Sequence, residues 1–472
     1  MSGTIADKLH LLAETKENIR QAIENKGVAV GKSDAFSLYP EKINAISTGG
    51  TSSTATGEYL VMVIDYDGTV IDRQYLNAGD CYELPTPPEH DRITFDSWSC
   101  PVAVNNNKIT VPEYDVIIGP TYTINSGKLE IDVLMNEVTG LTYKMSVAGT
   151  KDWGDGTVDN LTEHTYADYG NYTIVCDNAS LSQYNNLTWR SAGVQQNNTC
   201  VVSVLIPNIT LKNEGLAALN SLQSVVFGKG INELPVAFFG QYTNLYNCCI
   251  LPNGMTSISQ NYADSGTGLP WYVRYLVIPN TVSYINFRNF HYDNLKYLTV
   301  PESVTTIYRG DGVGNLYAYT LKGINFLKQD YLNGLIQNCY NLEHIYLAEG
   351  ITTIRTGNST GGSSTFVKGS KYLKKVVFPS TVTEIGGYAF EGCPTIEVLD
   401  FTKCTQIPTL DGTNAFNAIK PYCKILVPAE LYEQWITATN WTAYAPYIDF
   451  EREPINVTVT TDLNNAQISG GI

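Results

Sequence analysis

A repeated phrase in the second half of the chain constrains its fold more than any other feature. The phrase reads L-x-x-Φ-x-Φ-P-x-x-Φ-x-x-Φ, where Φ is apolar, and its clearest copies span residues 295–307 and 373–385. A third copy, residues 342–354, has Ala348 at the proline position. Looser copies begin at Leu222, Leu245, Val273, Leu321 and Ile396. A phrase that recurs about every 20 to 30 residues predicts a solenoid whose units bury their apolar edges by stacking, and hence a binding or structural protein.

The composition favours a surface that is polar, uncharged and aromatic. Charged residues make up 16% of the 472 residues, and Tyr occurs 32 times, which suits contact with carbohydrate or protein. The net charge of −16, without any basic cluster, excludes nucleic acid as a partner, since phosphate binding needs clustered Lys and Arg. No long apolar run is present, so we expect no membrane insertion. The ten Cys residues lack metal-ligand spacing and predict buried, reduced thiols.

Residues 1–46 predict a helical attachment segment. A helix is expected over residues 4–26, and Gly27 suits its C-terminal end. The helix carries an apolar stripe with the spacing of a coiled coil or docking helix. The stripe consists of Ile5, Leu9, Leu12, Ile19 and Ile23. Because residues 47–57 are rich in Gly, Ser and Thr and predict a flexible linker, we expect the stripe to bind another chain. The charges in this segment also predict that it is not a secretory signal.

Residues 58–124 predict a small β domain. The apolar run 60–64 predicts a strand, and Asp67-Gly68 is a hairpin turn signal. The phrase that begins at Asp67 and continues through Leu84-Pro85 to Phe95-Asp-Ser-Trp98 resembles the Listeria–Bacteroides repeat, a ubiquitin-like module of surface adhesins. This resemblance implies a β-grasp-like fold with Phe95 and Trp98 in its core.

Three short phrases follow one another within residues 125–180. They are Trp153-Gly-Asp-Gly-Thr157, His164-Thr-Tyr166 and Gly170-Asn-Tyr-Thr-Ile174. Their order and spacing resemble the PKD-type (polycystic-kidney-disease) β-sandwich. Asp152, Asp155 and Asp159 have the side chains of a calcium site, but capping of tight turns through their own carboxylates is the favoured role.

The repeats occupy residues 198–448. The phrase Ile385-Gly-Gly-Tyr-Ala-Phe-Glu-Gly-Cys393 follows a repeat strand and resembles the BspA-like leucine-rich repeat family. Leu431, Trp435 and Trp441 predict a short helix that caps the last repeat, and residues 449–472 predict a polar tail. The predicted fold class is therefore mainly β and multidomain, with an N-terminal helix, a small β-grasp-like domain, a PKD-like β-sandwich and a leucine-rich-repeat solenoid.

Motifs for catalysis, metal binding and cofactor binding are missing from the sequence. The five His residues lack the spacing of a metal site, and no G-x-S-x-G, P-loop or dinucleotide-binding phrase occurs. Carboxylates are numerous, so residue counts alone leave a glycosidase open. We predict a protein that is not an enzyme, with no catalytic residue, no metal and no cofactor.

The alternation of side chains along a strand predicts which repeat residues face outward. Aligning the copies places four aromatic residues together on one outward face, while Phe378 and Ile385 point inward. The four residues are Tyr275, Tyr297, His344 and Tyr346. Tyr suits recognition of sugar or protein, so this face is the predicted contact with a host-cell protein or glycan. The alternative is that it reflects a Tyr-rich composition and strand propensity.

The N-terminal segment also carries a resemblance that bears on function. The pattern from Lys8 through Lys16, Ile23 and Phe36 to Ile43 resembles the leader of tail and fibre-like proteins from phages of gut bacteria. It implies a virion appendage, a tail or head fibre-like protein made in the host cytoplasm and released by lysis. Its N-terminus would bind other virion proteins and its solenoid the host, and we expect a homo-oligomer. The alternatives are a baseplate or capsid decoration protein whose repeats bind virion proteins, and a bacterial surface adhesin.

Overall fold

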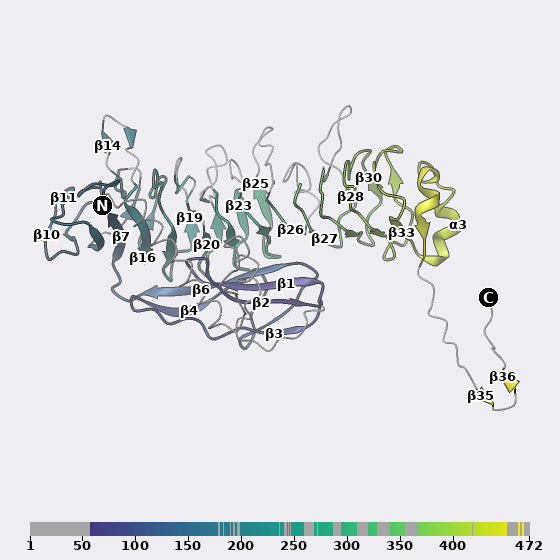
Figure 1. The fold of residues 1–472 in the computed structure, drawn as a ribbon, viewed down its shortest axis with the longest axis horizontal. Helices are drawn as coiled ribbons and strands as arrows, with labels where there is room; N and C mark the ends of the chain where they lie inside the picture. The colour runs from purple at the N-terminus through teal and green to yellow at the C-terminus, as the bar shows by residue number, and fades with distance from the viewer. Residues whose placement is uncertain are drawn as a thin grey trace, which may run out of the picture.

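The computed structural model describes residues 57–450 and a short C-terminal hairpin, 461–462 and 465–466. Gaps in this description fall at 178–179, 183, 189, 192–193, 196–198, 236, 240–242, 244, 246, 259–268, 271, 287–293, 309–319, 328–339, 355–365, 368 and 418. The predicted N-terminal helix with Ile5, Leu9, Leu12, Ile19 and Ile23, the linker and most of the tail lie outside the described residues. The described part is an elongated solenoid, also called the coil below, with a small β domain beneath it (Figure 1).

The small β domain, residues 57–124, contains a four-stranded sheet of order β2-β1-β6-β4 and a two-stranded sheet β3-β5. Its strands are β1 (Tyr59–Ile64), β2 (Val70–Leu76), β3 (Cys81–Glu83), β4 (Ile93–Ser99), β5 (Lys108–Thr110) and β6 (Val116–Ile124). β1 and β2 form the predicted hairpin, in which Gly68 has φ 87°. Trp98 is buried, as predicted, and Phe95 packs beside it while staying partly exposed. The resemblance to the Listeria–Bacteroides repeat stays a prediction.

Residues 125–195 form an N-terminal cap on the coil. Its strands are β7 (Leu129–Met135), β8 (Thr142–Lys144), β9 (Lys151–Asp152), β10 (Val158–Asp159), β11 (Glu163–Thr165), β12 (Gly170–Cys176), β13 (Ser180–Leu181), β14 (Arg190–Ser191) and β15 (Val194–Gln195). The sheet of the cap has the order β10-β9-β12-β7-β16-β18, and its last two strands belong to the solenoid. One apolar core continues from Leu129 to Ile448. The cap and the solenoid therefore fold against each other as one body.

The turn phrases of the cap have local structural roles. Asp152 Oδ1 accepts a hydrogen bond from the Gly154 N–H at 3.0 Å, and Asp155 Oδ1 accepts one from the Thr157 N–H at 3.0 Å. Asp159 Oδ1 accepts from the Leu161 N–H at 2.9 Å. The predicted turn-capping roles are confirmed. The resemblance to a PKD-type sandwich stays a prediction.

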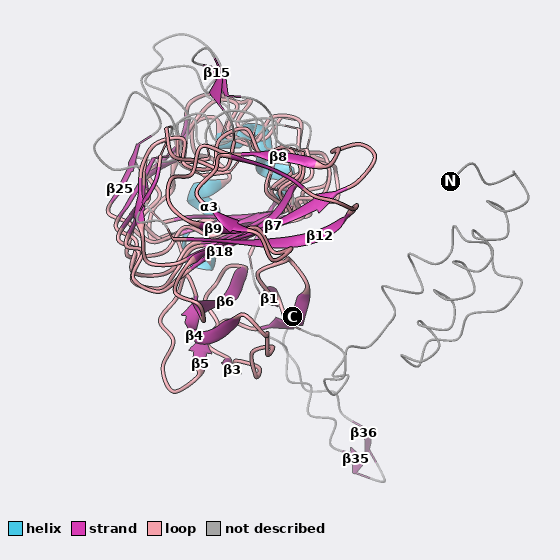
Figure 2. Cartoon of the chain, turned by 90° about the vertical axis from the view of Figure 1, so that its left-hand side faces the viewer, coloured by secondary structure: helices cyan, strands magenta, loops and turns pink. Residues whose placement is uncertain are grey.

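Two rows of short parallel strands build the solenoid. The first strand row consists of β16 (Val201–Ile206), β18 (Ser224–Phe227), β20 (Cys248–Ile250), β22 (Tyr275–Val277), β24 (Tyr297–Leu298), β26 (Gly323–Phe326), β27 (His344–Leu347), β29 (Lys375–Val377), β31 (Val398–Asp400), β33 (Lys424–Leu426) and β34 (Ile448–Asp449). The second consists of β17 (Thr210–Leu211), β19 (Glu233–Leu234), β21 (Ser257–Ile258), β23 (Tyr284–Asn286), β25 (Thr306–Tyr308), β28 (Thr353–Ile354), β30 (Glu384–Ile385) and β32 (Thr409–Leu410). Seen along the coil, the small β domain lies below and β25 lies in a side wall (Figure 2).

The repeat phrase maps directly onto this geometry. Its first half forms a strand of the first row, and its last apolar residue lies in a strand of the second row. The proline begins the turn between them, because the Val382 N–H donates to the Pro379 carbonyl at 3.2 Å. Ala348 uses its own N–H to reach the Phe326 carbonyl at 2.9 Å, a bond that a proline could not make. Phe378 and Ile385 are fully buried, as predicted.

A small helical unit closes the C-terminal end of the coil. It contains η3 (Ala429–Leu431), α3 (Tyr432–Trp435) and η4 (Trp441–Tyr447). Trp435 and Trp441 are buried against Phe401 of the last repeats, and the Trp441 Nε1–H donates to the Pro408 carbonyl at 2.7 Å. The predicted cap is confirmed. The strands β35 (Thr461–Asp462) and β36 (Asn465–Ala466) form the short antiparallel hairpin in the tail.

Candidate functional site

The small β domain packs directly on the first strand row of the solenoid. Leu60, Met62 and Ile64 of β1 and Ile117 of β6 share one apolar cluster with the outward side chains of the row. Those side chains are Cys248, Ile250, Tyr275, Val277 and Tyr297. The approach is close, because a Cβ added to Gly119 of β6 would lie 2.4 Å from Ile250 Cδ1. A larger residue at this position would have to displace the Ile250 side chain, so the glycine allows the close approach.

This packing corrects the predicted contact face. The strand register does align Tyr297 with His344 through Gly323. Tyr275 and Tyr297 lie in one apolar cluster. Tyr275 and Tyr297, however, are only 7% and 6% exposed. The prediction that they face solvent is wrong, because side chains of β1 and β6 cover them.

His344 and Tyr346 lie at the margin of the covered area and are partly buried. The Tyr346 ring packs against Tyr114 of the small β domain, with ring centroids 5.1 Å apart. This burial raises the pKa of the Tyr346 hydroxyl. These two residues are thus brought to a junction between the two parts of the chain rather than to an open face.

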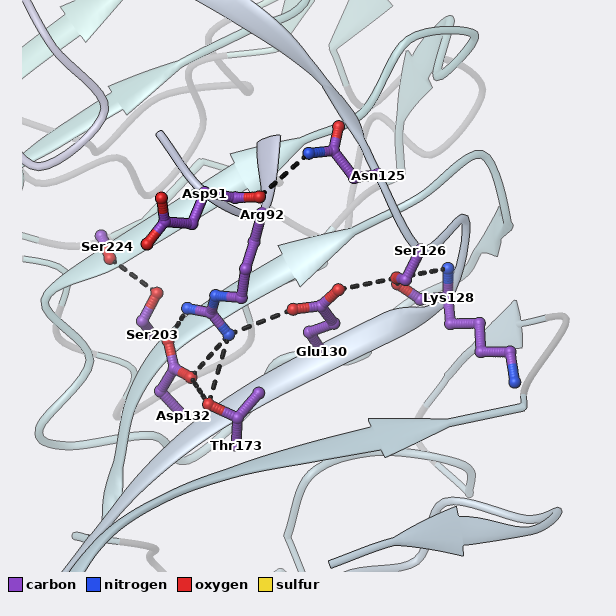
Figure 3. Close-up of polar contacts among 10 residues, drawn as sticks. All are labelled: Asp91, Arg92, Asn125, Ser126, Lys128, Glu130, Asp132, Thr173, Ser203 and Ser224. Carbon is purple, nitrogen blue, oxygen red and sulfur yellow. Dashed lines mark hydrogen bonds and ion pairs between the residues drawn. The ribbon is translucent and has the colours of Figure 1, made fainter. Parts of the chain in front are cut away.

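Polar contacts fasten the small β domain at both of its ends. At the cap end, the Arg92 guanidinium donates to Asp132 at 2.8 and 2.6 Å and to Glu130 at 3.1 Å (Figure 3). Both carboxylates lie on β7, whose opposite neighbours are β12 and β16. At the other end, Lys403 pairs with Glu113 at 3.2 Å. The position of the domain along the coil is therefore fixed by contacts that are far apart in the sequence.

A pocket of about 560 Å³ opens at this second end, between the small β domain and the first strand row. We call it the junction pocket. Its volume lies in the range of about 300–1,000 Å³ that is usual for ligand sites, and a boundary between domains is a usual place for one. Its apolar lining includes Ile324, Ile345, Leu347 and Phe378. Its aromatic lining comprises Tyr59, Tyr114, Tyr346 and Tyr372.

The pocket has a structural cause in the strand pairing. The first row is interrupted between β27 and β29, which belong to different sheets, and also between β18 and β20 and between β22 and β24. The last two interruptions lie beneath the small β domain, whose side chains pack against β18, β20, β22 and β24. The interruption at β27 and β29 lies at the margin of the domain, so it stays open.

Asp115 gives the pocket a buried carboxylate in its wall. Its Oδ1 accepts a hydrogen bond from the Leu60 N–H at 2.8 Å, and its Oδ2 has no hydrogen-bond partner among the described residues. Burial raises the pKa of this carboxyl, an effect that nearby His344 opposes. A Cβ at residue 323 would lie 2.4 Å from Oδ2, so Gly323 leaves the room that the carboxylate occupies.

Long ion pairs line the mouth of the pocket. Lys375 Nζ lies 3.8 Å from Glu58 Oε1 and 3.7 Å from Asp400 Oδ2. Tyr372, beside them, is 54% exposed. The pair of Lys375 with Glu58 is exposed on both sides and this long, so it contributes little to stability and its charges are available to a ligand. Aromatic rings next to exchangeable charges are suited to binding a polar ligand.

The described residues offer little for covalent or metal chemistry. Cys81 is exposed and the other described Cys residues are buried and free, so the prediction of buried, unpaired thiols holds for all described positions except Cys81. Burial raises the pKa of Cys393 and Cys423 to about 11, which keeps these thiols protonated near neutral pH. Within the described ranges, no three His, Cys, Asp or Glu side chains are grouped to hold a metal ion. No helix there is long and apolar enough to cross a membrane.

The sequence prediction missed most of the junction pocket. Tyr59, Tyr114 and Asp115 come from the small β domain, and their meeting with β27 depends on how that domain docks. Tyr372 directly precedes the repeat phrase that begins at Leu373, and exposed Tyr422 is separated from β33 by Cys423 alone. A Tyr shortly before a strand of the first row was therefore a local signal in the sequence for an exposed tyrosine.

Comparison with known proteins agrees with the repeat architecture. The model of the BspA type leucine rich repeat region matches in six copies, over residues 196–311, 271–397 and 333–433. These matches together cover just over half of the chain. No curated protein matches the sequence.

Solved structures similar to this chain include two bacterial leucine-rich repeat proteins. A leucine rich cell surface protein from Faecalibacterium prausnitzii is 15% identical, with 53% of this chain and 87% of that protein covered and a TM-score of 0.20. A leucine-rich repeat protein from Bacteroides ovatus is 14% identical, with 65% and 99% covered and a TM-score of 0.21. Likenesses this low carry nothing about ligands from those proteins to this one.

Proposed function

The chain belongs to the BspA type leucine rich repeat family, and we propose that it is a non-enzymatic adhesion protein that binds a cell-surface protein or glycan in the junction pocket. The observation that carries this proposal is the pairing of Tyr59 and Tyr114 with Tyr346 and Tyr372 across the junction. Both halves of the pocket are held in place before a ligand arrives, which lowers the entropic cost of binding.

The place of action that we propose is a phage particle. The N-terminal stripe of Ile5, Leu9, Leu12, Ile19 and Ile23 would bind other virion proteins and hold the chain, as a homo-oligomer, in a tail or head appendage. The support is the sequence of that segment and the linker after it. Deleting residues 1–46 should leave a folded protein that no longer joins the particle. Incorporation at the normal level would contradict this part of the proposal.

The adhesion proposal is tested with the full-length chain and intact cells. Labelled protein is screened against a panel of gut bacteria, and Tyr372→Ala is then compared with the unaltered protein on the strains that are bound. Tyr422→Ala is the matched control, because Tyr422 is also an exposed Tyr shortly before a strand of the first row but lies outside the pocket. We expect weaker binding for Tyr372→Ala alone. Equal binding by all three proteins, or no bound strain, would contradict the proposal.

A further inference from the structure

A second groove, distinct from the junction pocket, opens in the second strand row. Its volume is about 970 Å³, and it lies between β17 and β19, close to the N-terminal cap. β17 pairs with β13 of the cap, whereas β19 pairs with β21 of the next repeat. The strand row is therefore interrupted between β17 and β19, as the first row is at the junction pocket.

The groove results from a short connection in the first repeat of the solenoid. Only residues 207–209 connect β16 to β17, whereas residues 251–256 connect β20 to β21 in a later repeat. The short connection leaves β17 beside the cap strand β13 instead of in line with β19. The strands β16 and β18 at the start of the same two repeats are nevertheless paired in parallel. The groove is thus a wedge between two repeats that are joined along one edge.

Amide side chains dominate the polar lining of this groove. Asn208, Asn213 and Asn232 line it, and within the described part of the chain none makes a side-chain hydrogen bond. Each amide offers both donors and an acceptor, the combination that pairs with neighbouring hydroxyls of a sugar. Asn208 has room because residue 230 is glycine, where a Cβ would lie 2.6 Å from Asn208 Nδ2.

Charge and aromatic surface narrow the class of ligand. The groove contains one Lys and one Glu, Lys212 and Glu233, so its formal charge is balanced. Tyr184 lines the groove and is 73% exposed, and an exposed aromatic ring can stack on the C–H face of a sugar ring. Amides, balanced charge and an exposed ring suit a neutral and hydroxyl-rich molecule better than an acidic glycan or an apolar one.

We propose that the groove between β17 and β19 is a saccharide site that takes a neutral oligosaccharide, with Tyr184 stacking on a sugar ring and Asn208 and Asn232 bonding its hydroxyls. The site is independent of the junction pocket, because the two share no lining residue. Two sites on one chain would let a weak contact at each give a stronger attachment to a glycan-coated surface.

The experiment is titration calorimetry of the full-length chain with cellohexaose, maltohexaose and mannohexaose, and with polygalacturonate as an acidic comparison. We expect at least one neutral hexasaccharide to bind, and Asn208→Ala, Asn232→Ala and Tyr184→Ala each to weaken that binding by about three- to ten-fold. Tyr422→Ala, an exposed Tyr far along the coil, and Tyr372→Ala of the junction pocket should leave it unchanged. All five positions are exposed, and unchanged melting temperatures will show that the variants are folded.

Several results would overturn the saccharide site. They are the absence of binding by all three neutral sugars, binding of polygalacturonate alone, and binding that only Tyr372→Ala weakens. The last result would place the sugar in the junction pocket, which would contradict this site while supporting the adhesion proposal. If Tyr372→Ala bound cells less well but bound the sugar normally, both proposals would be supported, because cell binding would depend on the junction pocket and sugar binding on the groove.

Discussion

The two strand rows of the solenoid share one core, but the outer surface of the first is apolar and covered, whereas that of the second is polar and exposed. On the first row, Ile250, Tyr275 and Val277 point outward and are buried beneath the small β domain. On the second row, a line of exposed hydroxyl side chains runs along the coil, each donating to a carbonyl of the previous repeat. We call this line the hydroxyl ladder; it includes Thr256, Ser283, Thr305, Thr383 and Thr409.

The difference shows that the polarity of the outward side chains depends on whether another part of the chain covers them. A hydroxyl can bond to the neighbouring repeat and still meet water, so it suits a bare face. Apolar outward residues would be costly on a bare face, at about 25 cal/mol per Å² of exposed apolar area. The outward tyrosines of the first row therefore signalled a partner, and that partner is a domain of the same chain.

The strongest test of the comparison removes a covered tyrosine. Tyr297→Ala should lower the free energy of unfolding by about 3 kcal/mol, because a buried aromatic side chain is lost at the domain interface. Proteolysis within residues 57–124 should quicken as the small β domain loosens. Urea unfolding monitors the first effect and timed digestion the second.

Tyr422→Ala is the control for this substitution, since Tyr422 is 60% exposed on the same solenoid. We expect a change within about 0.5 kcal/mol for it. Equal effects of the two substitutions would mean that the first row is not covered in solution.

The second test cuts the polar fastening at the cap. Arg92→Ala should cost about 1–2 kcal/mol, between the values for exposed and buried ion pairs, because Glu130 and Asp132 lose a cation while Arg92 itself is 40% exposed. The measurement is urea unfolding at low and high salt. Lys108→Ala removes an exposed pair with Glu83 inside the small β domain and should change stability by less than about 0.5 kcal/mol. An Arg92→Ala effect no larger than that would show that this contact does not hold the domain.

Local patterns predicted the repeats well. The spacing of Leu373, Phe378 and Ile385 predicted which residues are buried, because in a solenoid each unit contacts its sequence neighbours. The placement of Tyr297 and His344 at matching positions of the repeats was also predicted correctly, since both are aligned with Gly323. Turn capping by Asp155 follows from residues two positions apart. In all these cases the deciding contacts are local or repeat at a fixed period.

The docking of the small β domain could not be predicted in this way, since Ile117 meets Tyr275 without any fixed spacing. One signal was present in β1. Its residues Leu60-Val-Met-Val-Ile64 are apolar without alternation, which is typical of a strand buried on both faces. Both faces of β1 are indeed buried, one by the core of its own domain and one by the solenoid. The junction pocket, which depends on the same docking, was missed for the same reason.

A third test uses pH to examine the interface at Asp115. Burial raises the pKa of Asp115 above its ordinary value, against the opposing influence of His344 and the Leu60 N–H. An acid with a raised pKa in the docked state favours docking when it is protonated. Its contribution is complete below about pH 4 and is lost as the pH rises through the raised pKa. Asp115→Asn should remove this part of the pH dependence.

The measurement for Asp115 is the difference in free energy of unfolding between the two proteins from pH 4 to 8. We expect the advantage of Asp115→Asn to grow with pH and then level off. The effect should be smaller than that of Arg92→Ala, because the Leu60 N–H remains bonded in both forms. A constant difference across the range would show that Asp115 does not titrate at the interface.

The smallest expected effect comes from the hydroxyl ladder, where one substitution can be made on both rows. Thr305→Val removes an exposed hydrogen bond of 3.1 Å to the Ser283 carbonyl and should cost no more than about 0.5 kcal/mol, because water replaces the lost donor. Thr299→Val removes a buried hydrogen bond of 2.8 Å to the Asp115 carbonyl of the small β domain. It should cost about 1–2 kcal/mol, because water cannot reach the carbonyl to replace the lost donor. Urea unfolding of the two variants measures both values. A larger loss of unfolding free energy for Thr305→Val than for Thr299→Val would contradict the comparison. It would mean that the exposed hydroxyls of the second row stabilise the protein more than the buried contact of the first row with the small β domain.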